Sequence, residues 1–190
     1  NNTMPGAGAA YSFRYKNYRA PQLADISLVE NSFKVTGNWL HGIFVEVGDI
    51  PLDNIDPYIT GMQFLVDFQP ASEYQSAKEI DYKLAAGIRN KGLIYTRQLP
   101  IKENTTYLLR SIAYRGKVLK TVEGFIYNEL DYDKRKDVIV VFRVVRQDLD
   151  GNTTIAWKLI SSKDSPKIES LEQKENIKEN RFAAGVSEED

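Results

Sequence analysis

The chain has 190 residues, and its 25 Lys and Arg nearly balance its 26 Asp and Glu, giving a formal net charge of -1. That balance gives no electrostatic case for nucleic acid or an anionic membrane as the main partner, and no apolar run approaches the roughly 20 residues of a membrane span. The chain has no cysteine, which excludes disulfides, thiolate metal sites and cysteine nucleophiles. The 11 Tyr, 8 Phe and 2 Trp indicate a globular protein rich in strand formers.

The N-terminal part of the chain predicts short strands separated by turns. Residues 1–10 are small and polar, and we expect a flexible lead there, of the kind that follows signal-peptide cleavage in an exported protein; a trimmed chain is the other interpretation. Three strands are then expected, before a polar loop over 49–58: Tyr11–Tyr15, Phe33–Trp39 after the turn residues Glu30-Asn31-Ser32, and Ile43–Val47.

The middle of the chain predicts three strands and one helix. Met62–Phe68 is a strongly apolar run that ends before Pro70, which indicates a strand. Residues 71–79 have helical character, with Ser72 as the expected N-cap. Ile80–Ala86 and Leu93–Leu99 are expected to be strands.

The strongest signal is the stretch from Tyr107 to Ile160, which predicts four strands joined by turns. These strands are Tyr107–Arg115, Lys117–Asn128, Val138–Gln147 and Thr153–Ile160. Val138–Gln147 is apolar on both faces, so we expect it to be a central strand covered on both sides. Thr153–Ile160 alternates polar and apolar residues, which is typical of a half-exposed strand.

The composition changes after Ile160. Residues 161–190 are highly charged, and we expect a tail that is partly helical or disordered. Ile168, Leu171 and Ile177 could form an apolar stripe on a helix over 167–180. About ten strands within 11–160 predict an all-β domain, an antiparallel two-sheet sandwich that is immunoglobulin-like or jelly-roll-like; a barrel is the alternative.

One local sequence carries a resemblance. Leu99-Pro-Ile-Lys-Glu-Asn-Thr-Thr-Tyr107 is followed by alternating Leu109, Ser111 and Ala113. This stretch resembles the region around strand F of fibronectin type III and other immunoglobulin-like sandwiches. The resemblance implies a tyrosine corner, in which the Tyr107 hydroxyl bonds back to the upstream backbone. It implies a sandwich fold and no particular function.

The sequence offers little catalytic chemistry. His41 is the only histidine, and no Gly-x-Ser-x-Gly nucleophile motif accompanies it. We expect it to be half exposed at the end of a strand, without a catalytic role. An enzyme that uses a pair of carboxylates is the last-ranked hypothesis. The protein is therefore expected not to be an enzyme.

Two candidate ligand sites follow from residue type. Asp49, Asp53 and Asp56 share one loop with Asn54, and their oxygens could hold calcium; Pro51 and Pro57 equally explain a stiff loop without metal. Trp39 and Trp157, together with tyrosines, could form a platform for carbohydrate, although such residues are more often part of a core.

The leading functional hypothesis is a non-enzymatic structural or interaction module, an exported subunit of a protein assembly in the cell envelope or outside the cell. Its partners would be further copies or other subunits, bound by tail or edge-strand contacts. The N-terminal segment is the candidate contact, through Tyr11, Phe13, Tyr15 and Tyr18. The alternative is a module that binds carbohydrate or another small ligand.

Overall fold

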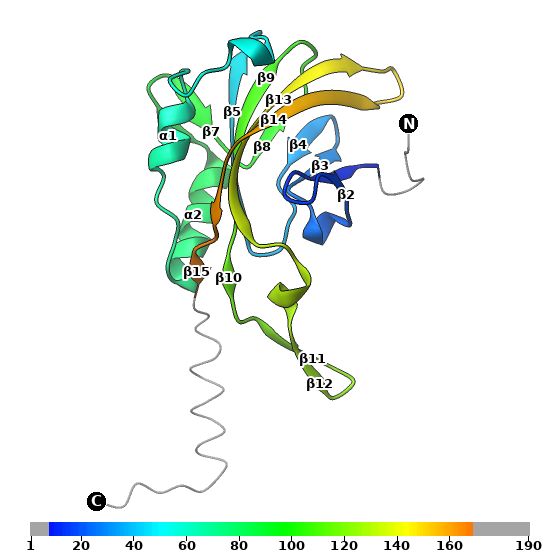
Figure 1. Cartoon of the computed structure of the whole chain (residues 1–190), viewed down its shortest axis with the longest axis vertical. Helices are drawn as coiled ribbons and strands as arrows, with labels where there is room; N and C mark the ends of the chain where they lie inside the picture. Colours follow the sequence, from blue (N-terminus) through cyan, green and yellow to red (C-terminus); the bar gives the residue numbers. More distant parts are fainter. Residues whose placement is uncertain (1–7, 169–190) are drawn as a thin grey trace, which may run out of the picture.

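A computed structural model of the chain describes residues 8–168. Strands make up 48% of the structure and helices 18%, with the strands arranged in several antiparallel sheets. The predicted all-β, sandwich-like class is therefore confirmed. Figure 1 shows two packed sheets, with two helices on the outer side of the larger sheet.

The larger sheet has four antiparallel strands in the order β14-β13-β9-β5. They span Leu40–Gly48 (β5), Thr106–Ala113 (β9), Lys136–Gln147 (β13) and Thr153–Asp164 (β14). The predicted central strand is confirmed, because β13 lies between β9 and β14. Its side chains alternate between the two faces, with Phe142 in one core cluster and Val141 in the other.

The smaller sheet has the order β2-β1-β3-β4-β8. Its strands are short: Ala10–Ser12 (β1), Asn17–Tyr18 (β2), Ile26–Val29 (β3), Ser32–Lys34 (β4) and Gln98–Pro100 (β8). Phe13 and Phe33, next to or within this sheet, pack on Phe142 of the larger one. This contact buries the core between the two sheets.

The opposite face of the larger sheet is covered by α1 (Met62–Asp67), α2 (Tyr74–Ala86) and the hairpin of β6 (Ile88–Asn90) and β7 (Leu93–Tyr95). Leu65 and Leu84 of the helices are fully buried in the cluster that contains Ile43 and Leu108 of the sheet. The fold therefore has a third, mainly helical layer that the sequence did not predict.

Two predicted strands are wrong. Met62–Phe68 forms α1, where Met62 and Leu65 are buried three residues apart, as on one face of a helix. Ile80–Ala86 is the second half of α2, which buries Ala77 and Leu84. The predicted helix over 71–79 therefore begins later and continues to Ala86. Ser72 is not its N-cap, since Glu73 occupies that position.

Two other predicted strands are divided. Lys117–Asn128 forms a hairpin, β11 (Leu119–Val122) and β12 (Phe125–Asn128). Leu93–Leu99 divides into β7 and β8, and Thr96 between them bridges to Phe44 of β5. Figure 1 shows the β11–β12 hairpin projecting away from the two sheets.

The ends of the expected domain also differ in detail. β14 runs to Asp164, four residues past its expected end. Lys167–Ile168, where a helix over 167–180 was expected to start, forms β15, which pairs in parallel with β10 (Arg115–Gly116). The rest of that predicted helix, and most of the expected N-terminal lead, lie outside the described residues. Three 3-10 helices complete the structure: η1 (Pro21–Leu23), η2 (Leu52–Asn54) and η3 (Glu129–Tyr132).

Tyr107 makes the type of bond that the sandwich resemblance implies. Its hydroxyl donates to the Pro100 carbonyl at 2.9 Å and accepts the Lys102 N–H at 3.0 Å. Burial raises the pKa of Tyr107 to about 12, so the hydroxyl keeps its proton at neutral pH. Kinship with fibronectin type III or immunoglobulin-like domains stays a prediction.

Candidate functional site

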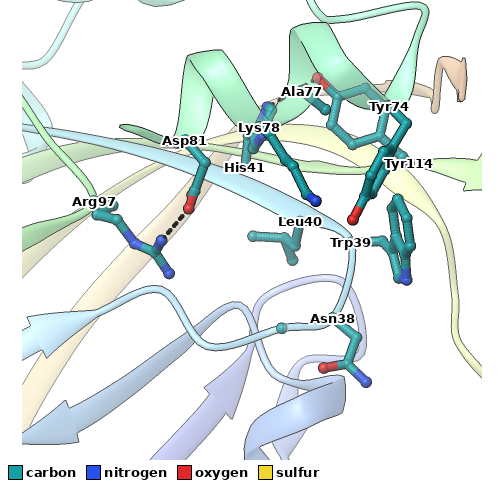
Figure 2. Close-up of a pocket in the computed structure, with 11 residues that line it drawn as sticks. Asn38, Trp39, Leu40, His41, Tyr74, Ala77, Lys78, Asp81, Arg97 and Tyr114 are labelled. Carbon is teal, nitrogen blue, oxygen red and sulfur yellow. Dashed lines mark hydrogen bonds and ion pairs between the residues drawn. The ribbon is translucent and has the colours of Figure 1, made fainter. Parts of the chain in front are cut away.

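A cavity of about 350 Å³ lies between α2 and the start of β5. Five parts of the chain line it: the β4–β5 connection with Asn38 and Trp39, the start of β5 with His41, α2, Arg97 between β7 and β8, and Tyr114 just after β9. Figure 2 shows these side chains around the cavity.

Aromatic side chains form one wall of this cavity. The ring centroids of Trp39 and Tyr74 lie 5.2 Å apart, with the rings tilted by 44°. The Lys78 ammonium lies 4.3 Å from the Tyr74 ring centroid, a cation–π distance. Trp39 also has a positive φ of 51°, which is unusual for a bulky residue. Trp39, which the sequence predicted to bind a ligand, is one of the residues that line this cavity.

His41 forms the floor of the cavity and is 6% exposed, so the expectation of a half-exposed histidine is wrong. Its Nδ1 lies 3.0 Å from the Tyr114 hydroxyl, which accepts the Ala71 N–H at 2.9 Å. We assign the hydroxyl proton of Tyr114 to the bond with Nδ1, which makes His41 neutral, with its proton on Nε2. Burial lowers the pKa of His41, outweighing the Asp81 charge and a backbone bond with Ala77, which raise it.

Charged side chains form the rim. Arg97 donates from Nη1 to Asp81 Oδ2 at 2.5 Å, and the two side chains are 31% and 41% exposed. The Nε atom of Arg97 is buried and has no hydrogen-bond partner among the described residues. Figure 2 shows the Lys78 ammonium between this ion pair and the aromatic wall.

The cavity therefore combines an aromatic wall with charged groups at its rim. An apolar surface with a few polar groups aimed at the same space is the usual composition of a small-ligand site. The single histidine is buried, neutral and bonded to Tyr114, so it holds the floor in place. The arrangement is suited to binding.

Trp157, the second predicted ligand-binding tryptophan, lies elsewhere. It lines a groove of about 660 Å³ between β14 and the smaller sheet, and its ring packs 5.1 Å from Phe13 and 6.1 Å from Tyr11. The structure does not bring Trp39 and Trp157 into one platform, because they line separate cavities.

The N-terminal segment predicted to bind a partner pairs within its own chain, since β1 lies between β2 and β3. Phe13 is 2% exposed in the core, so this residue is corrected from a contact to a core residue. The Tyr15 hydroxyl accepts the Lys134 N–H at 2.6 Å, and Tyr11 is half buried. Only Tyr18, 42% exposed, offers a large exposed surface.

The candidate calcium ligands do not converge. Asp49 forms an ion pair with Arg143 at 2.6 Å, and Asp56 accepts the Tyr58 N–H at 2.7 Å. Asp53 lies in η2, exposed. Within residues 8–168 no three acidic or histidine side chains group so as to hold a metal ion. A turn stiffened by Pro51 and Pro57 fits this loop better than a calcium site.

The β11–β12 hairpin carries exposed apolar side chains. Four of them form what we call the hairpin patch, with exposed fractions from 52% to 78%: Leu119, Val122, Phe125 and Ile126. Asn128 anchors the base of the hairpin, because its side chain accepts the Val118 N–H and donates to the Gly116 carbonyl. The structure thus presents exposed apolar side chains on both faces of a projecting element.

No family model, curated protein or solved structure matches this chain. Over residues 8–168, no helix is both long and apolar enough to cross a membrane.

Sequence reasoning missed most of the cavity. Tyr74, Lys78 and Asp81 are spaced by four and three residues and share one face of α2. Had the helix been predicted to extend to Ala86, this spacing would have placed the three residues on one face. Arg97 carries no comparable local signal, since only the fold brings it to α2. The hairpin patch was missed because Glu123-Gly124 was not recognised as a turn.

Proposed function

We propose that this protein is a non-enzymatic interaction module, a subunit that assembles with further copies of itself through the hairpin patch. The observation that carries the proposal is the projecting hairpin, which exposes four apolar side chains. The register places Val122 and Phe125 on one face of the hairpin and Leu119 and Ile126 on the other, so each face offers an apolar pair to a partner.

The stability of the hairpin supports the same proposal. β11 and β12 pair only with each other among the described strands, and an isolated two-stranded hairpin is marginally stable in water. A partner that covers the face with Val122 and Phe125, or the face with Leu119 and Ile126, would bury apolar surface and stabilise the hairpin. Assembly therefore gives this element a physical role that the monomer does not provide.

The free edge of β14 is a second contact surface. β14 has twelve residues and pairs only with β13 in the described part of the chain, so the backbone groups of its other edge are open to strand addition. Leu159, 44% exposed, lies on this strand. The edge-strand contact expected from the sequence would take place here more readily than at the N-terminal segment.

The solution mass, measured by size-exclusion chromatography with light scattering, tests the proposal. We expect the wild-type protein at a multiple of 21.6 kDa and a Phe125→Ser, Ile126→Ser double variant at the monomer mass. Tyr58→Ser is the matched control, because Tyr58 is 92% exposed and lies outside the hairpin. A monomeric wild type, or an unchanged mass in the double variant, contradicts the proposal.

The alternative, a module that binds carbohydrate or another small ligand, is favoured by one observation, the cavity beside Trp39 and Tyr74. It is independent of assembly, since none of the residues of the hairpin patch lines that cavity.

A further inference from the structure

We infer that two copies of this protein pair through the free edges of β14, antiparallel and about a two-fold axis at Trp157. In this pair, Leu159 of each copy lies opposite Ile155 of the other. The inference rests on the proposed self-assembly and adds the geometry of its edge contact, on a surface separate from the hairpin patch.

The regular part of β14 determines where a second strand pairs. The register of β14 with β13 is regular from Ile155 to Leu159 and shifts beyond each of these residues. Such a shift disturbs the ladder and bends the strand. A strand added to the free edge therefore pairs best along this regular stretch, and the midpoint of the stretch is Trp157.

The regular stretch is complementary to its own reverse. A two-fold axis at Trp157 places Trp157 opposite its copy, Ile155 opposite Leu159, and Ala156 opposite Lys158. Apolar side chains then meet apolar ones, and Lys158, the one charged residue of the stretch, meets a methyl group. A surface that matches itself in this way is what a two-fold interface between identical copies requires.

The neighbouring registers match less well. An axis at residue 158 would place Lys158 opposite its own copy, and like charges directly opposite each other are destabilising. An axis at residue 156 would place Leu159 opposite Thr153 and leave the Ile155–Leu159 contact unmade. The register about Trp157 is therefore the one that we infer.

The face of β14 that points towards the smaller sheet has room for the partner. Leu159 pairs with Val140 of the core between the sheets, yet Leu159 is 44% exposed while Val140 is fully buried. The groove of about 660 Å³ beside Ile155 and Trp157 opens on this side. Opposite residues of an antiparallel pair share a face, so Leu159 of the second copy would extend over this groove and become buried.

The inferred contact is short, and a short two-stranded pairing is marginally stable by itself in water. It adds to the contact through the hairpin patch and does not replace it. A protein that lacks the hairpin contact therefore still runs at the monomer mass when it is diluted during chromatography.

Disulfide cross-linking between single-cysteine proteins tests the register, because the chain has no cysteine of its own. Ile155→Cys and Leu159→Cys proteins are mixed under a mild oxidant. In the inferred pair their Cβ atoms lie about 4.5–5.5 Å apart, close to the disulfide range. Two copies of the same variant hold their cysteines four residues apart along the strands, roughly 13 Å. We expect the mixed disulfide to form at least about tenfold faster than either homodisulfide, because pairing raises the effective concentration of the thiols.

A second pair and a control accompany this measurement. Ala156→Cys with Lys158→Cys repeats the test on the opposite face of β14, away from the core between the sheets. Leu149→Cys, in the exposed turn before β14, should cross-link with Leu159→Cys only at the rate of random collision. Mixed disulfides no faster than this control in both pairs overturn the inference. A homodisulfide of Ile155→Cys or Leu159→Cys that forms as fast as their mixed disulfide overturns it as well.

The solution mass separates the inference from the proposed function. If cross-linking fails while the mass still depends on Phe125 and Ile126, the hairpin patch assembles the protein and the β14 pair is overturned. If the wild type runs as a monomer while the mixed disulfide forms, also with Phe125→Ser and Ile126→Ser present, the β14 pair stands and assembly through the hairpin patch is overturned.

Discussion

At the scale of single residues, the bond between His41 on β5 and Tyr114, just after β9, links neighbouring strands of the larger sheet at the cavity floor. Tyr114 also accepts the Ala71 N–H, so one hydroxyl connects the sheet to the segment before α2. Protonation of Nδ1 would turn this acceptor into a donor, and the Tyr114 hydroxyl, which already accepts the Ala71 N–H, would lose the acceptor for its own proton. The neutral form of His41 is therefore part of the folded structure.

This geometry predicts a pH dependence of stability. Burial lowers the folded-state pKa of His41 below the ordinary histidine value of 6.5, so the unfolded chain takes up the proton first as the pH falls. The contribution of His41 is then fully present above about pH 6.5 and is lost as the pH falls below that value. Thermal unfolding measured from pH 8 to pH 5 should show the melting temperature falling through this range.

A variant at position 41 tests whether His41 causes this pH dependence, because the chain has a single histidine and no other side chain ordinarily titrates between pH 5 and pH 8. His41→Asn keeps an acceptor near the position of Nδ1 but cannot take up a proton. Its melting temperature should vary less over the same range, whatever its absolute stability. An equal slope in both proteins would show that His41 is not the cause.

At the scale of elements, three hairpins share one turn geometry. Each has two loop residues, both with positive φ: Glu30-Asn31, Lys91-Gly92 and Glu123-Gly124. Positive φ at both positions is the type I′ turn, whose twist matches that of paired strands. Glu123, with φ of 51°, adopts a conformation that asparagine tolerates better.

We therefore expect Glu123→Asn to stabilise the β11–β12 hairpin by about 0.5–1 kcal/mol, a typical gain when a residue suits its backbone conformation. Amide hydrogen exchange would detect it as slower exchange in β11 and β12. Glu30→Asn makes the matched change in the β3–β4 hairpin and should leave β11 and β12 unaffected. Unchanged exchange in both variants would indicate that the side chain at this position does not limit the hairpin.

The elements also show where sequence reasoning succeeds. Alternation located β5, β9, β13 and β14 because each packs against a core on at least one side, and Glu30-Asn31 was recognised as a turn because asparagine favours positive φ. Met62–Phe68 was assigned to the wrong class because a short apolar run has the same composition in a buried strand and a covering helix. The cavity depends on Arg97 meeting α2, a tertiary contact with no local pattern.

At the scale of the whole molecule, a buried ionic network joins the two sheets. The Asp25 carboxylate, before β3, accepts from Ser12 Oγ, Arg14 Nε and Ser111 Oγ. Ser111 lies on β9 of the larger sheet, while Ser12 and Arg14 belong to the N-terminal segment. Arg14 in turn donates to Asp133 at 2.7 Å, so the network reaches the segment before β13.

Removing Asp25 should therefore destabilise the whole molecule. Asp25→Ala leaves Arg14 buried with one carboxylate partner instead of two, and breaking a buried pair costs about 3–5 kcal/mol; the remaining bond to Asp133 places the expected loss near the lower figure. Asp49→Ala, which removes an exposed pair with Arg143, should cost at most about 1 kcal/mol. Urea unfolding followed by circular dichroism measures both.

The slope of the unfolding transition with urea adds a second criterion, because it reflects the surface exposed on unfolding. If Asp25→Ala lowers the midpoint and keeps the slope, the two sheets still unfold together and the network contributes free energy to one cooperative unit. A reduced slope in Asp25→Ala would mean that the smaller sheet unfolds before the larger one. The network would then be the interaction that couples the unfolding of the smaller sheet to β9. A midpoint equal to that of Asp49→Ala would contradict both readings, and the apolar contacts of Phe13 and Phe33 with Phe142 would then suffice to hold the sheets together.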